Sequence, residues 1–550
     1  MTASTILHYD HHHLLAKYFT LAVNQMYPPQ YFFFGKSSEW EDELNPPLVN
    51  RLEETSEYDL RNNMLYVERL RGSEITFAIK RVDWSGGRVF DRFDYYSPTN
   101  LAFSGADNIF DSTSLVITTD MNIYKCIDNN ASGVSSVMPT GKETTYFTTS
   151  DGYVWKYMYT LNQIHELNFL TDKWVPIRSS IPATVSYDGN VYKVENSGFG
   201  YNEDNTILSV SGDGFDAHIR PVITAGRITA IEVLNPGFAY TVATIDIICP
   251  DITRPRGTGA VITADFPFIN ITNESSSVQL TAINGELSAI SVTNGGANYV
   301  VGETAVVITG DGSGASATAT VENGAIKSVN IVSRGKGYSK AEVVIIGNGD
   351  GATARAIIAP SGGHGHDIVE ESRSRVVAIR KAVSQTITQG IPGWTDYRQS
   401  GIIAHPDEFK NAEGDYNIYR KYFQQESGAT TYGVYSPDIN IDQYQMDEIL
   451  MRLSDQSLWR AIAIKDEELA LFSEENKVPA VGDQFTNVTV TTDATTGEPI
   501  YTPNALLFTV SFVREPEVQK FSGTLLYYDN REVYHQIKNS AVIVQTYIEF

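Results

Sequence analysis

The sequence predicts a mainly β protein: a multi-domain β-sandwich body with a few short helices and an inserted Gly-rich β-repeat region. Short apolar runs alternate with turn residues along most of the chain. The 42 Gly, 31 Tyr and 24 Phe residues favour strands joined by turns. One long stretch repeats a glycine-punctuated pattern. Because single cores stop growing at roughly 250–300 residues, we expect the 550 residues to form several domains.

The charge balance and the cysteine count limit the possible functions. The chain has 41 basic and 66 acidic residues and a net charge of −25, which repels nucleic-acid phosphate and anionic lipid. We therefore expect no nucleic-acid partner and no membrane partner. Cys126 and Cys249 cannot form a disulfide scaffold, and so few cysteines suit a reducing cytoplasm. Residues 1–10 lack a signal-peptide pattern, and no 18-residue apolar stretch predicts a membrane span.

The first part of the chain predicts two helices and several strands. Residues 14–27 form a helical pattern, because Leu14, Leu15, Tyr18, Phe19 and Ala22 fall on one face. Prolines 28 and 29 end this helix, and a second short helix is expected at 58–70. Strands are expected at 31–35, 75–80, 88–93 and 174–177.

Residues 113–160 predict a rigid β-framework. Two strand pairs are expected, at 115–117 with 123–127 and at 144–149 with 153–160. Strand alternation places four aromatic residues on one face of the last strand. They are Tyr153, Trp155, Tyr157 and Tyr159. We expect this face to be buried in a core or an interface, whereas the alternative is an exposed platform for sugar.

Residues 189–360 predict an inserted domain, or two, built from four copies of a Gly-x-apolar…Gly-x-x-Tyr unit. The copies begin at Gly189, Gly226, Gly285 and Gly324, and they end at Tyr201, Tyr240, Tyr299 and Tyr338. The closing tyrosines of the first two copies map onto those of the last two with a shift of 98 residues, which indicates internal duplication of a hairpin-like module. Residues 1–188 and 361–550 are then the two halves of one body. In the second half, strands are expected at 376–382, 401–404, 506–513, 524–528 and 541–550.

No pattern predicts a catalytic, cofactor or metal site. His364, His366 and Asp367 supply metal-ligand types, but too few of them for a coordination shell, so we expect a packed or hydrogen-bonded turn. The Gly-Asp-Gly runs at 212–214 and 310–312, and the related 347–351, lack the ligand series of a calcium loop and are expected to be hairpin turns. His11 to His13 are expected in a solvated segment before the first helix.

Hydrolytic chemistry is also not indicated. The acidic pairs at 53–54, 370–371 and 467–468 are adjacent in sequence, whereas glycoside hydrolysis needs two carboxyl groups from separate elements across a cleft. Gly-x-Ser-x-Gly is absent, and neither cysteine has the context of a nucleophile. We therefore expect a protein that is not an enzyme.

Several segments together resemble a known family. They are Phe34-Gly35-Lys36-Ser37-Ser38, Asn45-Pro46-Pro47, Tyr58-Asp59-Leu60, Arg81-Val82-Asp83-Trp84, Tyr124-Lys125-Cys126-Ile127-Asp128-Asn129-Asn130, Pro139-Thr140-Gly141, Ser150-Asp151-Gly152-Tyr153-Val154-Trp155-Lys156-Tyr157-Met158-Tyr159, Gly362-Gly363-His364-Gly365 and Gly523-Thr524-Leu525-Leu526-Tyr527-Tyr528-Asp529-Asn530-Arg531-Glu532. In this order the chain resembles the β-rich, dimeric baseplate wedge subunit of T-even-type contractile-tailed bacteriophages. The resemblance covers roughly residues 14–185 and 361–550, and the repeat region is a departure from it.

The resemblance implies a structural role without catalysis. The family member would be a homodimer, would contact the other baseplate wedge subunits, and would belong to the tail baseplate of the virion after assembly in the host cytoplasm. It would help to transmit the baseplate rearrangement on host attachment. The alternative is a host-surface carbohydrate-binding or carbohydrate-cleaving tail protein that uses the repeats as its binding module.

Overall fold

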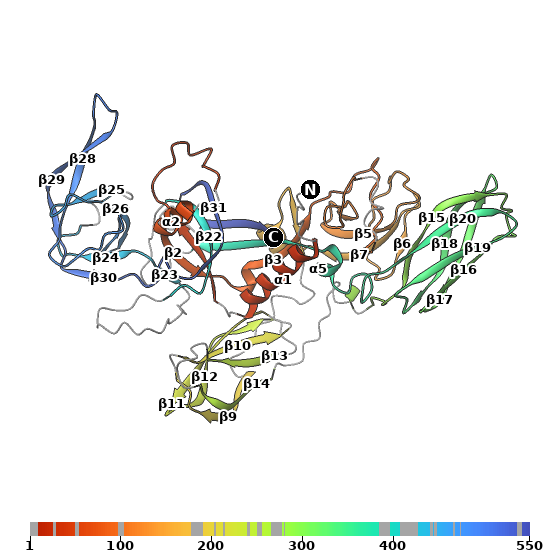
Figure 1. Ribbon diagram of the computed structural model, residues 1–550, viewed down its shortest axis with the longest axis horizontal. Helices are drawn as coiled ribbons and strands as arrows, with labels where there is room; N and C mark the ends of the chain where they lie inside the picture. Colours follow the sequence, from red (N-terminus) through yellow and green to blue (C-terminus); the bar gives the residue numbers. More distant parts are fainter. Residues whose placement is uncertain are drawn as a thin grey trace, which may run out of the picture.

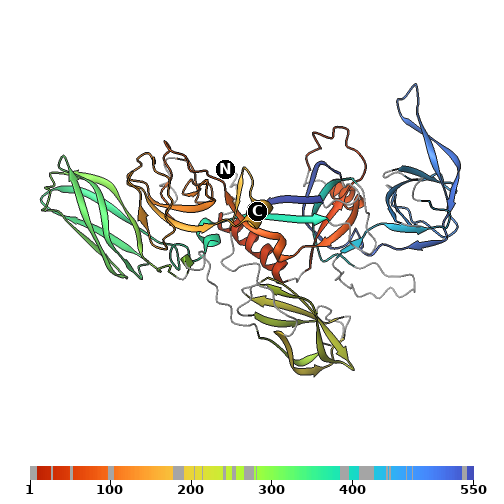
Figure 2. The same ribbon diagram turned by 180° about the vertical axis from the view of Figure 1, so that it is seen from behind.

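The computed structural model is mainly β, with short helices. It describes residues 9–25, 29–49, 54–96, 104–177, 191–202, 205–212, 215–238, 243–249, 256–265, 278–279, 281–383, 396–407, 427–440, 444, 448–465, 468–473, 475–535 and 542–550. Figure 1 shows a central body with a green lobe at one end, a blue lobe at the other, and an olive lobe beside the middle. The same three lobes extend from the body in the view from behind (Figure 2).

The body is built from strands of both ends of the chain. Among the described strands, one sheet has the order β23-β2-β1-β22-β31 and another has the order β32-β21-β3-β8. Their strands are β1 (Gln30–Gly35), β2 (Met64–Arg69), β3 (Ile75–Lys80), β8 (Trp174–Pro176), β21 (Val376–Val383), β22 (Asp396–Ala404), β23 (Ser427–Ala429), β31 (Thr524–His535) and β32 (Val542–Glu549). Early strands thus pair with late ones: β1 lies beside β22, and β3 lies beside β21.

The apolar run of β1 is explained by burial on both sides of the sheet. Phe32 and Phe34 belong to the core that also contains Val377 of β21, whereas Phe33 packs on the opposite side near Ile403 of β22. All six residues of β1 are buried. A strand covered on both faces needs apolar side chains at every position, so its sequence shows no polar alternation.

The first helix, α1 (Tyr9–Gln25), is longer at its start than predicted and buries another face. Ala16, Phe19 and Val23 are in the core, whereas the predicted contact residues Leu14, Leu15 and Tyr18 are at least 45% exposed. The predicted face was therefore wrong except for Phe19. His11 to His13 lie inside α1 instead of before it, and His13 is buried with Nδ1 2.6 Å from the carbonyl oxygen of Ser374.

The second predicted helix is correct only in its first part. Helix α2 (Glu54–Asn62) ends before Met64, where β2 begins. Val67 of β2 pairs with Phe33 of β1, and residues 64–67 are fully buried between two cores. Tertiary pairing overrides the local helical pattern here, because a strand can bury both of its faces. The strand predicted at 88–93 is not formed; only Arg88 makes an isolated bridge, to Ser135.

The predicted framework forms a sheet with the order β4-β5-β7-β6 among the described strands. These strands are β4 (Leu115–Ile117), β5 (Asn122–Asp128), β6 (Phe147–Thr148) and β7 (Val154–Thr160). The pairing register shifts where Ile123 and Tyr124 of β5 meet Tyr159 and Tyr157 of β7. A bulge places an extra residue on one strand and breaks the alternation of side chains. Tyr159 therefore packs in a different cluster from Trp155 and Tyr157, which corrects the prediction of one shared face.

The blue lobe contains most of the late strands. Its described strands have the order β29-β28-β25-β26-β27-β24-β30. They are β24 (Tyr432–Tyr435), β25 (Glu448–Arg452), β26 (Leu458–Lys465), β27 (Glu468–Phe472), β28 (Gln484–Thr492), β29 (Pro499–Thr509) and β30 (Phe512–Arg514). Trp459, Phe485 and Phe508 are in the core of this lobe.

The repeat region forms two lobes, which we call the first repeat unit (residues 191–265) and the second repeat unit (residues 285–360). The strands of the first are β9 (Tyr192–Phe199), β10 (Ile207–Gly212), β11 (Phe215–Thr224), β12 (Arg227–Phe238), β13 (Ala243–Ile248) and β14 (Thr258–Ala264). Those of the second are β15 (Leu287–Ala297), β16 (Ala305–Gly310), β17 (Ser313–Glu322), β18 (Ala325–Lys336), β19 (Ala341–Ile346) and β20 (Asp350–Ile358). The bounds of β10 to β13 map onto those of β16 to β19 with the shift of 98 residues read from the sequence.

A tyrosine ring packed on glycine holds each described copy of the repeat. Tyr201, Tyr299 and Tyr338 are 5–7% exposed, and Tyr240 lies outside the described residues. A Cβ on Gly312 would lie 2.4 Å from Cγ of Tyr338, and a Cβ on Gly349 would lie 2.5 Å from Cγ of Tyr299. Glycine is therefore required because the aromatic ring occupies the space of a side chain.

The aspartate of the second Gly-Asp-Gly run caps a turn. The Asp311 carboxylate accepts hydrogen bonds from the backbone N–H groups of Ser339, at 2.9 Å, and Lys340, at 3.1 Å. The hydrogen bond from the Ser339 hydroxyl, together with these two backbone bonds, holds the pKa of Asp311 below its ordinary value. Gly212 ends β10, whereas residues 213 and 214 lie outside the described part of the chain.

We predict that Gly312→Ala destabilises the second repeat unit by about 1–3 kcal/mol, because the added methyl group must displace the Tyr338 ring. Hydrogen exchange of β17 and β18 in the full chain measures this effect. Gly86→Ala is the matched control, since its Cβ would meet only the Trp84 ring at 3.7 Å. Equal exchange rates in Gly312→Ala and the unchanged protein would contradict the packing argument.

Candidate functional sites

The residues considered for a metal site separate in the structure. His364 is buried, His366 is exposed, and Asp367 caps helix α5 (Ile368–Ser372) by accepting the N–H of Glu370 at 3.1 Å. Within the described residues, no group of three His, Cys, Asp or Glu side chains is placed to hold a metal ion. The turn at 364–367 is thus a hydrogen-bonded connection between the second repeat unit and α5.

A buried charge cluster surrounds His364. Lys125 of β5 and Glu371 of α5 form an ion pair, and their side chains are 0% and 1% exposed. The second Glu371 oxygen, Oε1, accepts the backbone N–H groups of Gly365, at 2.8 Å, and Asp367, at 3.1 Å. Such additional hydrogen bonds are what a buried pair needs to offset the loss of hydration.

His364 extends this cluster into the second repeat unit. Its Nδ1 lies 3.3 Å from Nζ of Lys125, and its Nε2 lies 2.6 Å from Oγ of Ser288. Burial, together with the nearby Lys125, lowers the pKa of His364 well below its ordinary value, so the ring is neutral. A neutral ring that accepts from the lysine at Nδ1 donates its Nε2 proton to Ser288.

Further polar groups join the framework sheet to the same repeat unit. Tyr146 donates to Glu286, Arg334 donates to the carbonyl oxygen of Leu287 at 2.8 Å, and its guanidinium lies 3.8 Å from the centre of the Tyr146 ring. Lys156 donates to the carbonyl oxygen of Thr144 at 2.7 Å, and burial lowers its pKa to about 8. The contacts of Tyr146 with Glu286 and Arg334 link the body to the second repeat unit, whereas the Arg334–Leu287 and Lys156–Thr144 bonds each lie within one part.

The aromatic residues of β7, with Tyr153 directly before it, form no surface platform. Tyr153, Trp155, Tyr157 and Tyr159 are each 0% exposed. Trp155 stacks on Tyr153 with ring centres 5.4 Å apart, and Phe90 meets it edge-on at 6.0 Å. The strand is therefore part of a core, as expected.

Other side chains considered from the sequence have separate environments. Glu370 contacts His13 and Lys17 of α1, whereas Glu371 lies in the buried charge cluster. Glu53 and Glu467 are outside the described residues. Cys126 is buried, Cys249 is partly buried, and neither forms a disulfide in the described structure.

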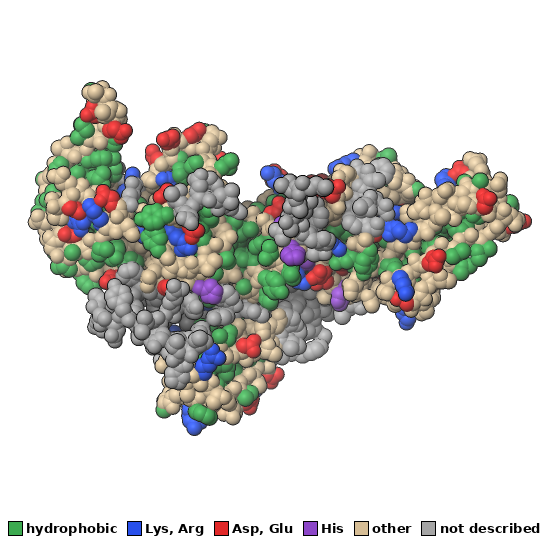
Figure 3. Space-filling view, in the orientation of Figure 1, with side chains coloured by type: hydrophobic (Ala, Val, Ile, Leu, Met, Phe, Trp, Pro, Cys, Tyr) green, Lys and Arg blue, Asp and Glu red, His purple; other side chains and the backbone are tan. Residues whose placement is uncertain are grey.

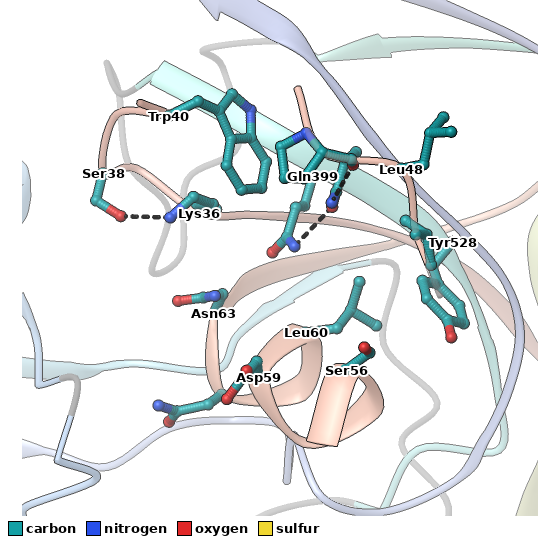
Figure 4. A pocket seen from close by; sticks show the side chains of 14 residues that line it. Lys36, Ser38, Trp40, Leu48, Ser56, Asp59, Leu60, Asn63, Gln399 and Tyr528 are labelled. Atoms are coloured by element: carbon teal, nitrogen blue, oxygen red, sulfur yellow. Dashed lines mark hydrogen bonds between the residues drawn. The ribbon is translucent and has the colours of Figure 1, made fainter. Parts of the chain in front are cut away.

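A polar pocket of about 590 Å³ lies between the loop after β1, helix α2 and strands β22 and β31. Figure 4 shows its side chains, which come from segments far apart in the sequence. Lys36, Asp59 and Tyr528 are in three of the segments that carry the family resemblance. The sequence did not indicate that these segments meet, and no sequence pattern identified Gln399 of β22 as a candidate binding residue.

An apolar stripe is exposed on α1. It consists of Leu14, Leu15, Tyr18 and Leu21, which are 45–60% exposed. Residues spaced by three and four positions share one side of a helix, so these side chains form a continuous stripe. Figure 3 shows hydrophobic side chains at the surface over the middle of the molecule, where α1 lies in Figure 1.

None of the described helices is both long and apolar enough to cross a membrane.

Comparison with known proteins gives no family assignment. No protein-family model matches the chain, and no curated protein matches it in sequence.

Proposed function

We propose that the protein is a structural component of a contractile phage tail baseplate that forms part of the wedge and acts through protein–protein contacts. The resemblance of residues 14–185 and 361–550 to T-even-type wedge subunits supports this proposal. In keeping with it, strands from these two parts pair within common sheets, and the repeat units project from them as separate lobes.

The exposed stripe on α1 is the observation that carries the proposal. Large apolar side chains gathered on a surface mark sites of protein contact, because water solvates them poorly. The stripe is held in place from behind by Ala16, Phe19 and Val23, so it is presented on a fixed helix. A fixed apolar helix face suits a permanent subunit contact.

In this role the protein works as a rigid connector. A homodimer with two-fold symmetry buries self-complementary surfaces, and permanent interfaces often exceed about 2,000 Å². Wedge neighbours held at such surfaces can dock again in a second arrangement when the baseplate rearranges on host attachment. The protein would be assembled in the host cytoplasm and carried in the virion, without an enzymatic step of its own.

The alternative function, a carbohydrate-binding or carbohydrate-cleaving tail protein, assigns sugar binding to the repeats. That role needs aromatic rings at equivalent exposed positions. In the three described copies the shared tyrosine is buried against glycine. This favours the structural role for the repeat units.

We predict that the double variant Tyr18→Lys with Leu21→Lys loses dimerisation or co-purification with the neighbouring baseplate proteins, because two charges in the stripe cannot be buried in an apolar contact. Both side chains are about half exposed, so the unfolding temperature should be unchanged. Light scattering after size-exclusion chromatography and co-expression measure the result.

The matched control for this experiment is Val332→Lys, which adds one charge at a side chain that is 70% exposed on β18. It should leave both properties intact. A stripe variant that dimerises and co-purifies like the unchanged protein would argue against α1 as the contact surface.

A further inference from the structure

The polar pocket beside α2 has nearly balanced charge and a mixed lining. Lys36 and Asp59 contribute one charge of each sign, and most other lining groups are hydroxyls and amides. Its volume of about 590 Å³ falls in the range of small-molecule sites, roughly 300–1,000 Å³. A polar ligand without net charge fits such a lining better than an ion.

Three linked groups fix the direction of one buried acceptor. The carbonyl oxygen of Pro47 can only accept, and Nδ2 of Asn530 donates to it at 2.9 Å. This orients the Asn530 amide so that its Oδ1 accepts from Nε2 of Gln399 at 2.8 Å. The Gln399 amide is thereby oriented as well, and its Oε1 must face away from Asn530.

That oxygen is left without a donor at the inner wall of the pocket. Gln399 is 6% exposed, and its Oε1 accepts no hydrogen bond in the described structure. Figure 4 shows this end of Gln399 directed into the space between Trp40 and Asn63. A buried acceptor without a partner is unfavourable, so the site is complementary to a ligand that brings an O–H or N–H donor.

An aromatic ring lies on the same side of the pocket. Nε1 of Trp40 donates to the carbonyl oxygen of Arg531 at 3.0 Å, and Nζ of Lys36 lies 4.5 Å from the ring centre. These contacts hold the indole in one orientation. Trp40, with Leu60 and Tyr528, supplies the apolar part of the wall.

We propose that this pocket binds a neutral sugar residue of a glycan. A pyranose offers hydroxyl donors to Gln399 and an apolar C–H face to the Trp40 ring, and it needs no opposing charge. The site is separate from the α1 stripe and from both repeat units, so the inference goes beyond the structural role. It gives a wedge component a contact with a carbohydrate surface.

Saturation-transfer NMR with the full-length protein tests the proposal, using the methyl glycosides of glucose, galactose, mannose and N-acetylglucosamine as probes. At least one should bind at millimolar concentration. Gln399→Met removes the acceptor at similar side-chain length and should weaken binding about tenfold. Trp40→Leu should weaken it independently, which keeps the test valid if one variant folds poorly.

Two controls separate this site from a structural or assembly role. Gln484→Met changes an exposed glutamine on β28 and should leave sugar binding intact. Gln399→Met should keep dimerisation and baseplate co-purification. The sugar-binding result can therefore be interpreted even if the wedge proposal fails. The inference is overturned if no probe binds, if neither pocket variant weakens binding, or if Gln399→Met abolishes assembly instead, as a peptide-binding pocket would.

Discussion

Trp155→Ala should lower the free energy of unfolding of the framework by about 3–5 kcal/mol, the usual cost of truncating a large core aromatic residue. The indole is fully buried, stacks on Tyr153 and meets Phe90 edge-on. Alanine would leave a cavity between β7 and its neighbours that these rings cannot fill without moving. Denaturant unfolding, followed by hydrogen exchange of β5 and β7, gives the value.

Trp155→Phe is the matched control. The indole N–H is buried and has no hydrogen-bond partner in the described structure. Phenylalanine removes this unpaired donor and keeps one aromatic ring, so the loss should be about 1–2 kcal/mol, smaller than for alanine. An unchanged midpoint in Trp155→Ala would mean that the strand does not hold the framework together.

Lys125→Met should cost about 3–5 kcal/mol, because it leaves the Glu371 carboxylate buried without its cation. Glu371→Gln should be costly for the reciprocal reason, since Lys125 then lies unpaired beside a neutral His364. The double variant Lys125→Met with Glu371→Gln removes both charges and should recover much of the loss. Denaturant unfolding of the four proteins forms a double-mutant cycle.

Hydrogen exchange in the turn beside the second repeat unit gives a second measure of what the ion pair contributes. Gly365 and Asp367 donate to Glu371, so loss of the pair should also loosen the turn that precedes α5. Hydrogen exchange should increase in residues 364–372 of each single variant. A single variant as stable as the unchanged protein would show that the pair has no net role in holding the repeat unit.

Local patterns in the sequence predicted much of the fold. The apolar run at 31–35 predicted β1, and the 98-residue shift predicted the duplicated strands of the repeat units, because both depend on neighbouring residues. The strand β2 was missed because its burial is decided by β1, some thirty residues earlier. Tyr159 packs on a different side of the sheet from Tyr157 because the register shifts between β5 and β7. The periodicity of a single strand cannot predict such a shift.

The candidate sites were harder to predict for the same physical reason. Lys125 and Glu371 are 246 residues apart, and Asn530 and Pro47 are 483 residues apart. Each residue alone reads as an ordinary polar side chain on a strand or a turn. Only the pairing of early with late strands brings them together, and no local pattern in the sequence predicts that pairing.

The pairing of β1 with β22 and of β3 with β21 has a consequence for synthesis on the ribosome. The strands of each repeat unit pair with partners made shortly before or after them, so both units can fold while the chain is still growing. β1 can pair with β2 soon after both are made, but its other edge must wait for β22, more than three hundred residues later. During translation, one edge of this phenylalanine-rich strand therefore stays unpaired until β22 is made, and a chaperone would have most to protect at the beginning of the nascent chain.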